Sequence, residues 1–254
     1  IKKENKMKNK QLFAAQKQKA DELFDAGKIE ESFVIFQKLH HQQPSDVAVL
    51  LGMAQCLVVL GKPDDALDIL DAILTEIPDL DIAILFKAQY LGEADRVQDA
   101  IQFLKGKIKS GFNDPEGYAV LGELYQKDDK PILAIKEFQN ALGFSSLLDR
   151  IAVSSNMANC YAEIGNYKKA IKIYDELLKI NPDNLVVLTN KALLLKEIND
   201  LSECLKILLR VTSLDPEFID AWIILADLYV ALGADDKSQE CVDKINALIT
   251  KQNE

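Results

Sequence analysis

The sequence predicts an all-α solenoid of antiparallel helix pairs, and three regularities support this fold class. Blocks of similar pattern follow one another every 34 residues, with a single spacing of 36 between the fourth and the fifth. Each block has small residues at two fixed positions, and a third position is restricted to residues that tolerate a left-handed backbone. Spacings of this length are typical of stacked helical hairpins. The seven blocks begin at Phe13, Val47, Asp81, Pro115, Ile151, Leu185 and Ile219.

Small residues at the eighth and twentieth positions predict where the two helices of a block cross. Antiparallel helices approach closely only where neither carries a bulky side chain. The eighth residues are Ala20, Ala54, Ala88, Gly122, Ala158, Ala192 and Ala226, and the twentieth are Ser32, Ala66, Ala100, Ala134, Ala170, Cys204 and Ser238. Large residues at the eleventh and twenty-fourth positions, such as Tyr161 and Tyr174, are expected to fill the space around the crossing.

The fifteenth position predicts the turn between the two helices, because its residues best tolerate a left-handed backbone. They are Gly27, Gly61, Asp95, Asp129, Gly165, Asn199 and Gly233. Pro63 and Pro131 follow two residues after this position, where a second helix begins and a missing amide hydrogen costs nothing. Prolines at the thirty-second position are expected to stop the second helix. These are Pro44, Pro78, Pro182 and Pro216.

This register resembles the tetratricopeptide repeat, which has small residues at positions eight and twenty, Leu or aromatic residues at eleven and twenty-four, and Pro at thirty-two. The segment YAEIGNYKKAIKIYDELLKINPDN of the fifth block matches it closely. The resemblance implies a right-handed superhelical solenoid of seven repeats over residues 13–252. A Lys-rich flank, residues 1–12, would precede it, and residues 253–254 would form a short tail.

Two junctions depart from the pattern. The third block has Lys107 and Phe112 where a small residue and Pro are expected, and its proline is delayed to Pro115. The fourth block ends in GFSSLLDR without Pro, and the two-residue insertion follows. We therefore expect a local change of superhelix pitch between the fourth and fifth repeats.

The charge of the chain argues against nucleic acid as a partner. The net charge is −10, and binding to phosphate backbones or anionic membranes is normally driven by Lys and Arg. The exception is the basic flank, which is either a solvated end or part of an anchoring segment upstream of Ile1. No apolar run is long enough to span a bilayer. We expect a cytoplasmic or otherwise reducing location, with tethering through a preceding segment as the alternative.

The four cysteines are far apart and form neither a CxxC motif nor a metal-binding cluster with histidine. We interpret Cys56, Cys160, Cys204 and Cys241 as buried free thiols. If a disulfide formed, Cys204 and Cys241 on adjacent second helices would be the pair to test.

Residues suited to catalysis are few, so the sequence predicts neither an enzyme nor a cofactor or metal site. His40 and His41 close the second helix of the first block, where a cation or polar group suits free carbonyls. The acidic pairs 64–65, 128–129 and 235–236 are interpreted as charges at the start of second helices.

The family resemblance implies that first helices line a concave groove, with positions two, five, nine, twelve and thirteen facing a ligand. In the second and third blocks, this predicts a largely aliphatic surface. It either holds a hydrophobic segment or amphipathic helix, or is covered by neighbouring helices. The residues are Leu51, Gln55, Val58, Ile82, Leu85 and Gln89.

Farther along, the predicted groove is acidic, which favours a basic partner segment. Its acidic residues are Glu123, Glu163, Glu197, Asp220 and Asp227, partly offset by Lys127 and Lys196. Asn156, Asn159 and Asn190 fall on the same inner face, where amides can bind a peptide backbone or remain simply solvated. The carboxylate clamp of chaperone-binding family members is not expected, because Asp21 and Ile82 stand at places that it needs.

The function predicted is that of a scaffold or adaptor that binds a partner peptide or helix in its groove. One alternative is the recognition arm of a larger multidomain enzyme, such as a glycosyltransferase. Another is self-assembly into a homo-oligomer, since solenoid ends expose apolar faces unless a polar helix caps them.

Overall fold

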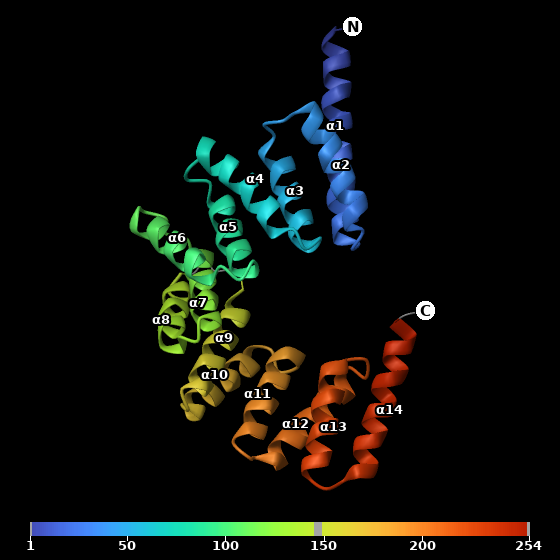
Figure 1. Ribbon diagram of the computed structural model, residues 1–254. Coiled ribbons are helices and arrows are strands. Elements are labelled where there is room, and N and C mark those ends of the chain that lie inside the picture. Colours follow the sequence, from blue (N-terminus) through green and yellow to red (C-terminus); the bar gives the residue numbers. More distant parts are fainter. Residues whose placement is uncertain (1, 145–148, 253–254) are drawn as a thin grey trace. The chain divides into compact units, whose positions relative to one another are not determined.

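The computed structural model describes residues 2–144 and 149–252, and these residues form fourteen helices and no strand (Figure 1). The helices are α1 (Lys2–Asp25), α2 (Ile29–Gln42), α3 (Val47–Val59), α4 (Pro63–Glu76), α5 (Asp81–Glu93), α6 (Val97–Lys109), α7 (Pro115–Lys127), α8 (Pro131–Leu142), α9 (Arg150–Glu163), α10 (Tyr167–Ile180), α11 (Leu185–Glu197), α12 (Leu201–Leu214), α13 (Ile219–Ala231) and α14 (Asp235–Gln252). The prediction of an all-α solenoid of helix pairs is confirmed.

The chain forms two compact units, an N-terminal unit up to Lys130 and a C-terminal unit from Pro131 onward. The N-terminal unit contains α1 to α7 and the C-terminal unit α8 to α14. Within each unit, every helix packs against the next one along the chain. Helix α1 begins well before Phe13, so the basic flank continues directly into the first repeat.

The left-handed residue predicted between the two helices is present in all seven repeats. The φ angles are 74° at Gly27 and Gly61, 60° at Asp95, 54° at Asp129, 75° at Gly165, 63° at Asn199 and 67° at Gly233. The next residue then donates its backbone N–H to the carbonyl five residues earlier, as Lys28 does to Leu23 (2.8 Å) and Asn166 to Tyr161 (2.7 Å). This bond satisfies a carbonyl that the helix end would leave free.

Helix boundaries follow the prolines as predicted. Pro63 and Pro131 are the first residues of α4 and α8, and α2, α4, α10 and α12 each end two residues before a proline. Acceptor side chains support several other starts. Asp46, Asp149 and Asn184 each accept a hydrogen bond from the backbone N–H three residues later, at 2.8 to 3.0 Å. Such caps satisfy orphan donors at a helix N-terminus.

The small residues predicted at the crossing are buried in every repeat. In the first repeat the two positions are directly bonded, because the Ser32 hydroxyl donates to the Ala20 carbonyl at 2.7 Å. Close backbone approach at this point lets the large residues on either side pack into the core. Tyr161 and Tyr174 are both buried around the crossing of the fifth repeat.

The irregular third junction is held by a different set of contacts. Lys107 donates to the Pro78 carbonyl at 2.5 Å, and Gly111, with φ of 115°, provides an additional left-handed turn. Phe112 packs on Gly117 of α7, where an added Cβ would lie 2.4 Å from the ring. The expected pitch change around 143–150 falls largely on residues 145–148, which lie outside the described residues.

One interpretation of the acidic pairs is wrong. Asp64 and Asp65 lie in the first turn of α4, and Asp235 and Asp236 in the first turn of α14, as expected. The pair 128–129 instead ends α7, because Asp129 is the left-handed residue that separates α7 from α8. The Asp128 carboxylate is paired with Lys130 at 2.6 Å and accepts a hydrogen bond from Gln98 at 2.5 Å. These bonds lower its pKa.

The four cysteines are free and buried, so the disulfide considered between Cys204 and Cys241 is absent. Burial raises the pKa of all four thiols, that of Cys160 to about 12. His40 and His41 lie in the last turn of α2, as predicted. Within residues 2–144 and 149–252, none of the helices combines the length and the apolar character that a membrane crossing needs.

Candidate peptide-binding surface

First helices of neighbouring repeats contact one another in both units. In the N-terminal unit α1 contacts α3 and α5 contacts α7, and in the C-terminal unit α11 contacts both α9 and α13. Side chains on these helices therefore form a shared surface in each unit, which we call its first-helix face. All of the predicted groove residues lie on these helices.

A cavity of about 310 Å³ lies between α5 and α7 on the first-helix face of the N-terminal unit. It is lined by Gln89, Gly92, Glu93, Val120, Glu123, Leu124 and Lys127. Gly92 keeps the two helices close, because a Cβ there would come within 2.8 Å of the Leu124 side chain. The cavity brings together three residues predicted for the groove, Gln89, Glu123 and Lys127, and adds Glu93.

The lining of this α5–α7 cavity contains both apolar side chains and carboxylates. Val120 and Leu124 are buried, whereas Glu93 and Glu123 are exposed. Protein atoms displace water around the Glu123 carboxyl and raise its pKa, and nearby Glu116 adds to this effect. The one lysine in the cavity, Lys127, donates to the Gly92 carbonyl at 2.5 Å.

The aliphatic residues predicted for the groove of the N-terminal unit are mostly covered. Leu51, Val58 and Leu85 are half-buried, as is Gln55, and only Ile82 is exposed, at 43%. None of these five residues lines the α5–α7 cavity. A neighbouring contact helps to fix α5, since Lys87 pairs with Asp71 of α4 and lies over the Phe103 ring, 4.8 Å from its centroid.

The three asparagines on the first-helix face of the C-terminal unit are half-buried and differ in their roles. The Tyr174 hydroxyl donates to the side-chain oxygen of Asn159, so this amide is used inside its own repeat. Asn156 and Asn190 occupy the same register in adjacent first helices, α9 and α11.

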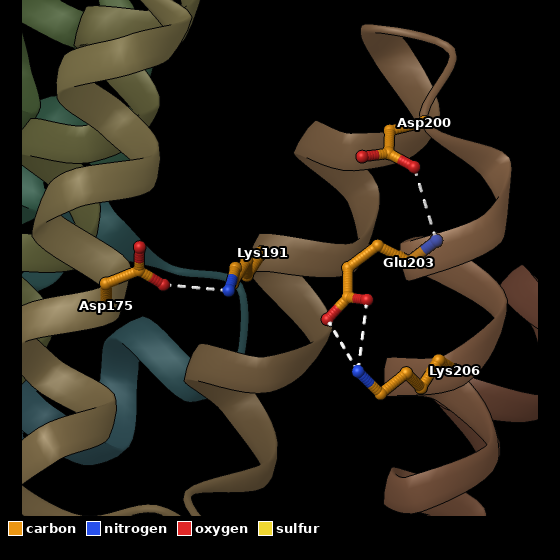
Figure 2. A network of polar contacts seen from close by, with 5 residues as sticks. All are labelled: Asp175, Lys191, Asp200, Glu203 and Lys206. Carbon is orange, nitrogen blue, oxygen red and sulfur yellow. Dashed lines mark hydrogen bonds and ion pairs between the residues drawn. The ribbon is translucent and has the colours of Figure 1, made fainter.

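Ion pairs partly neutralise the acidic residues of the C-terminal unit. Lys196 pairs with Asp227 at 3.4 Å, and the Tyr167 hydroxyl donates to Glu197 at 3.4 Å. Figure 2 shows a further pair, in which Lys191 of α11 contacts Asp175 of α10 at 2.7 Å.

Figure 2 also shows how the start of α12 is fixed. Asp200 accepts the backbone N–H of Glu203 at 3.3 Å, and the Glu203 carboxylate pairs with Lys206. A capping carboxylate followed by an ion pair one turn later stabilises a helix start. These contacts stabilise α12, the second helix of the sixth repeat, against which α11 and α13 pack.

Exposed aliphatic side chains on α11 and α13 were not predicted as site residues. They are Val186, Leu193, Ile223 and Val230, and their exposed fractions are 58%, 44%, 46% and 60%. In the block register they fall at positions two, nine, five and twelve. Applying the same family positions to the sixth and seventh blocks would therefore have predicted these four residues.

In the described part of the chain, His, Cys, Asp and Glu side chains do not gather into groups of three or more that could hold a metal ion. The buried thiols have raised pKa values and hence little nucleophilic thiolate. What the two first-helix faces offer is apolar surface with carboxylates and amides beside it.

Antiparallel helix pairs that repeat in register define a helical-repeat protein. The tetratricopeptide repeat family matches residues 23–90 and 152–184, one segment in each unit. The chain therefore contains segments that match tetratricopeptide repeats in both units. Proteins of this family are generally non-enzymatic scaffolds for protein interaction.

Similar proteins share the fold at low sequence identity. The TPR repeat-containing protein YpiA of Bacillus subtilis (strain 168) is 23% identical over 240 residues, which cover 88% of this chain and 53% of that protein. The chain thus spans about half the length of this curated relative.

Among solved structures, a tetratricopeptide repeat protein from Parabacteroides merdae has a TM-score of 0.73 at 14% identity, over 94% of this chain and 93% of that one. A chain of the APC/C hetero-tetramer Cut9-Hcn1 has a TM-score of 0.68 at 19% identity, over 85% and 42%. At these identities the likeness shows the fold alone.

Proposed function

We propose that the chain is a protein-interaction scaffold whose N-terminal unit binds a basic segment of a partner on its first-helix face. The observation that carries this proposal is the α5–α7 cavity, with its apolar side chains and its two carboxylates. Lys and Arg side chains have an apolar stem and a cationic head. In the cavity, the stem of such a residue would pack on Val120 and Leu124, and its head would reach Glu93 and Glu123.

The charges of the cavity support a cationic partner group over an anionic one. Two carboxylates face one ammonium group, and that ammonium group already donates to the Gly92 carbonyl. A cation beside Glu123 would also favour its charged form, which the displacement of water by nearby protein atoms disfavours in the free protein. The exposed aliphatic residues on α11 and α13 of the C-terminal unit provide a second surface for an apolar part of a partner.

A capture experiment with a double variant tests this function. The whole chain is immobilised and incubated with a cell extract, and the proteins retained are identified by mass spectrometry. We expect Glu93→Gln with Glu123→Gln to lose partners that contain Lys- or Arg-rich segments. Asp68→Asn with Glu76→Gln removes the same charge from exposed positions of α4 and should retain them. Identical retention by both double variants and the wild type would sink the proposed site.

The pH dependence of binding to a captured partner segment provides an independent readout. Because its pKa is raised in the free protein, Glu123 takes up a proton at a higher pH than an ordinary glutamate. Affinity for a cation should therefore fall as the pH is lowered through this raised pKa. Glu123→Gln should bind more weakly at neutral pH and with a flatter pH profile, measured by fluorescence anisotropy. A wild-type profile as flat as that of the variant would contradict the assignment.

A further inference from the structure

A second cavity of the N-terminal unit, of about 390 Å³, lies between the start of α5 and the loop that joins α6 to α7. This loop is the irregular third junction, in which Phe112 stands where the repeat pattern has a proline. We call the cavity the loop cavity, and it shares no lining residue with the α5–α7 cavity. It is lined by Asp79, Asp81, Ile84, Ser110, Gly111, Phe112, Asn113 and Asp114.

The lining of the loop cavity combines apolar side chains with three carboxylates. Ile84 is 1% exposed and Phe112 is half-buried. None of the described residues in the lining is Lys or Arg. Lys107 of α6 lies outside the lining, and its ammonium group donates to the Pro78 carbonyl at 2.5 Å. Apolar side chains beside carboxylates suit the apolar stem and the cationic head of a Lys or Arg side chain.

Two of the three carboxylates are available to a ligand. Asp114 already accepts hydrogen bonds from the backbone N–H groups of Glu116 and Gly117, at 2.9 and 3.2 Å. Asp79 and Asp81 are exposed, and among the described residues neither side chain has an ion pair or a hydrogen bond. A cation in the loop cavity would therefore meet Asp79 and Asp81 first.

A ridge of side chains on α5 connects the loop cavity to the α5–α7 cavity. Its residues follow one another at intervals of four, and they are Asp81, Leu85, Gln89 and Glu93. Residues at this spacing form a continuous row on a helix surface. Asp81 lines the loop cavity, whereas Gln89 and Glu93 line the α5–α7 cavity. Ile82, which is 43% exposed, adds apolar surface beside the ridge. The ridge thus has a carboxylate at each end and apolar surface between them.

The separation of the two cavities defines the ligand that could occupy both. Asp81 and Glu93 are twelve residues apart on α5, which corresponds to about 18 Å along the helix axis. Asp114 and Glu123, at the start of α7 and within it, are nine residues apart, or about 14 Å. An extended chain advances about 3.3 Å per residue, so about four to six residues would span this distance.

We propose that the partner segment is extended and has two Lys or Arg residues four to six positions apart, one in each cavity. This inference rests on the proposed function, because the α5–α7 cavity with Glu93 holds one of the two basic residues. The other pairs with Asp79 and Asp81 in the loop cavity, and an apolar residue between them packs on Ile82. In a helical segment, residues at this spacing would be only about 6 to 9 Å apart and could not reach both cavities.

The experiment compares two capped, fluorescein-labelled peptides of the same composition, GSRGLSGRSG and GSGLSRRGSG. The arginines are five positions apart in the first, the spaced peptide, and adjacent in the second, the paired peptide. Because the peptides have equal charge, general attraction to the acidic protein is the same for both. Each is titrated with the whole 254-residue chain at low ionic strength and followed by anisotropy. The spaced peptide should bind about ten-fold more tightly, since its second arginine binds intramolecularly.

Asp79→Asn with Asp81→Asn tests the loop cavity. This double variant should bind the spaced peptide about ten-fold more weakly, so that the two peptides have similar affinities. The matched control, Asp68→Asn with Glu76→Gln, removes two charges from exposed positions of α4 outside both cavities. It should keep the difference between the peptides. Circular dichroism of every variant confirms that affinities are compared between folded proteins.

A further double variant, Glu93→Gln with Glu123→Gln, separates this inference from the proposed function. It alters the α5–α7 cavity and should weaken the binding of both peptides. If it does so while the wild type binds the spaced and paired peptides equally, the loop cavity is not used and the proposed function stands. If it changes the affinity of neither peptide, the proposed function fails, and this inference fails with it.

Two other results would overturn the assignment of the loop cavity. One is an equal loss of affinity in the variant of Asp79 and Asp81 and in the α4 control, because the effect would then be one of net charge. The other is a mass that rises with concentration in light scattering and falls in the variant of Asp79 and Asp81. In that case the Lys-rich flank of a second copy, residues 1–12, would be the occupant.

Discussion

The N-terminal and C-terminal units make one contact identically and differ at a position next to it. Lys87 with Asp71 and Lys191 with Asp175 are the same ion pair in the same register. The position before this lysine in the repeat register is occupied by Gly52 in α3 of the N-terminal unit, and its missing side chain makes room for the Phe36 ring of α2. One junction in each unit thus has the same charge pair, while the packing at the neighbouring position differs from junction to junction.

The two units also differ in what their first helices leave exposed. In the N-terminal unit, Leu51 and Leu85 are half-buried, and carboxylates surround a cavity. In the C-terminal unit, Val186 and Leu193 are exposed beside paired charges. The same helix-pair frame therefore presents two chemically different surfaces. Contacts between repeats maintain the arrangement of the helix pairs, while the exposed positions of the first helices differ between the units.

The largest expected effect concerns the packing that distinguishes Gly52. We expect Gly52→Ala to lower the free energy of unfolding by about 2 kcal/mol, because the new Cβ would lie 2.4 Å from the buried Phe36 ring. Urea denaturation followed by circular dichroism measures it.

The control for this variant is Gly106→Ala in α6, where an added Cβ meets no atom within 4 Å. Because alanine favours a helix over glycine, this change should raise the free energy of unfolding by about 1 kcal/mol. If both substitutions changed the free energy of unfolding in the same direction, the Phe36 ring would not be what excludes a side chain at position 52.

A smaller effect tests the shared ion pair. We expect Lys191→Met to lower the free energy of unfolding by about 0.5 to 1 kcal/mol, as for a partly exposed pair. Lys87→Met should cost about 0.5 kcal/mol more, because Lys87 also lies over the Phe103 ring. Double-mutant cycles with Asp71→Asn and Asp175→Asn isolate the pair energy. A measurable coupling energy for the ion pair of one unit but not for that of the other would show that the two ion pairs are not equivalent.

The smallest effect concerns the turns, which the two units share. Asp95→Gly and Asn199→Gly should each raise the free energy of unfolding by about 0.5 kcal/mol, because both residues adopt positive φ. Asn166→Gly is the matched control, since the φ of Asn166 is negative, at −87°. Differential scanning calorimetry should show higher melting temperatures for the first two variants only. A rise for Asn166→Gly as well would point to a cause other than the left-handed backbone.

The positions of the helices and turns could be predicted from the sequence, but the side-chain partners in the candidate site could not. Residues such as Gly61 and Pro63 act through local backbone geometry, so their consequences follow from sequence alone. Glu93 and Glu123 share a cavity because α5 contacts α7, a contact between helices that are not consecutive. The use of the Asn159 amide depends on Tyr174, fifteen residues later in the next helix. Side-chain partners of this kind are determined by packing that a single sequence does not specify.

The buried cysteines provide a way to time the opening of individual segments. Cys56 lies in α3 of the N-terminal unit, while Cys160, Cys204 and Cys241 lie in α9, α12 and α14 of the C-terminal unit. A buried thiol of raised pKa reacts with an alkylating reagent only after its surroundings open. The labelling rate of each cysteine, followed by peptide mass spectrometry, therefore measures how often that helix separates from its neighbours. A bound partner should slow the labelling of those helices that it holds together.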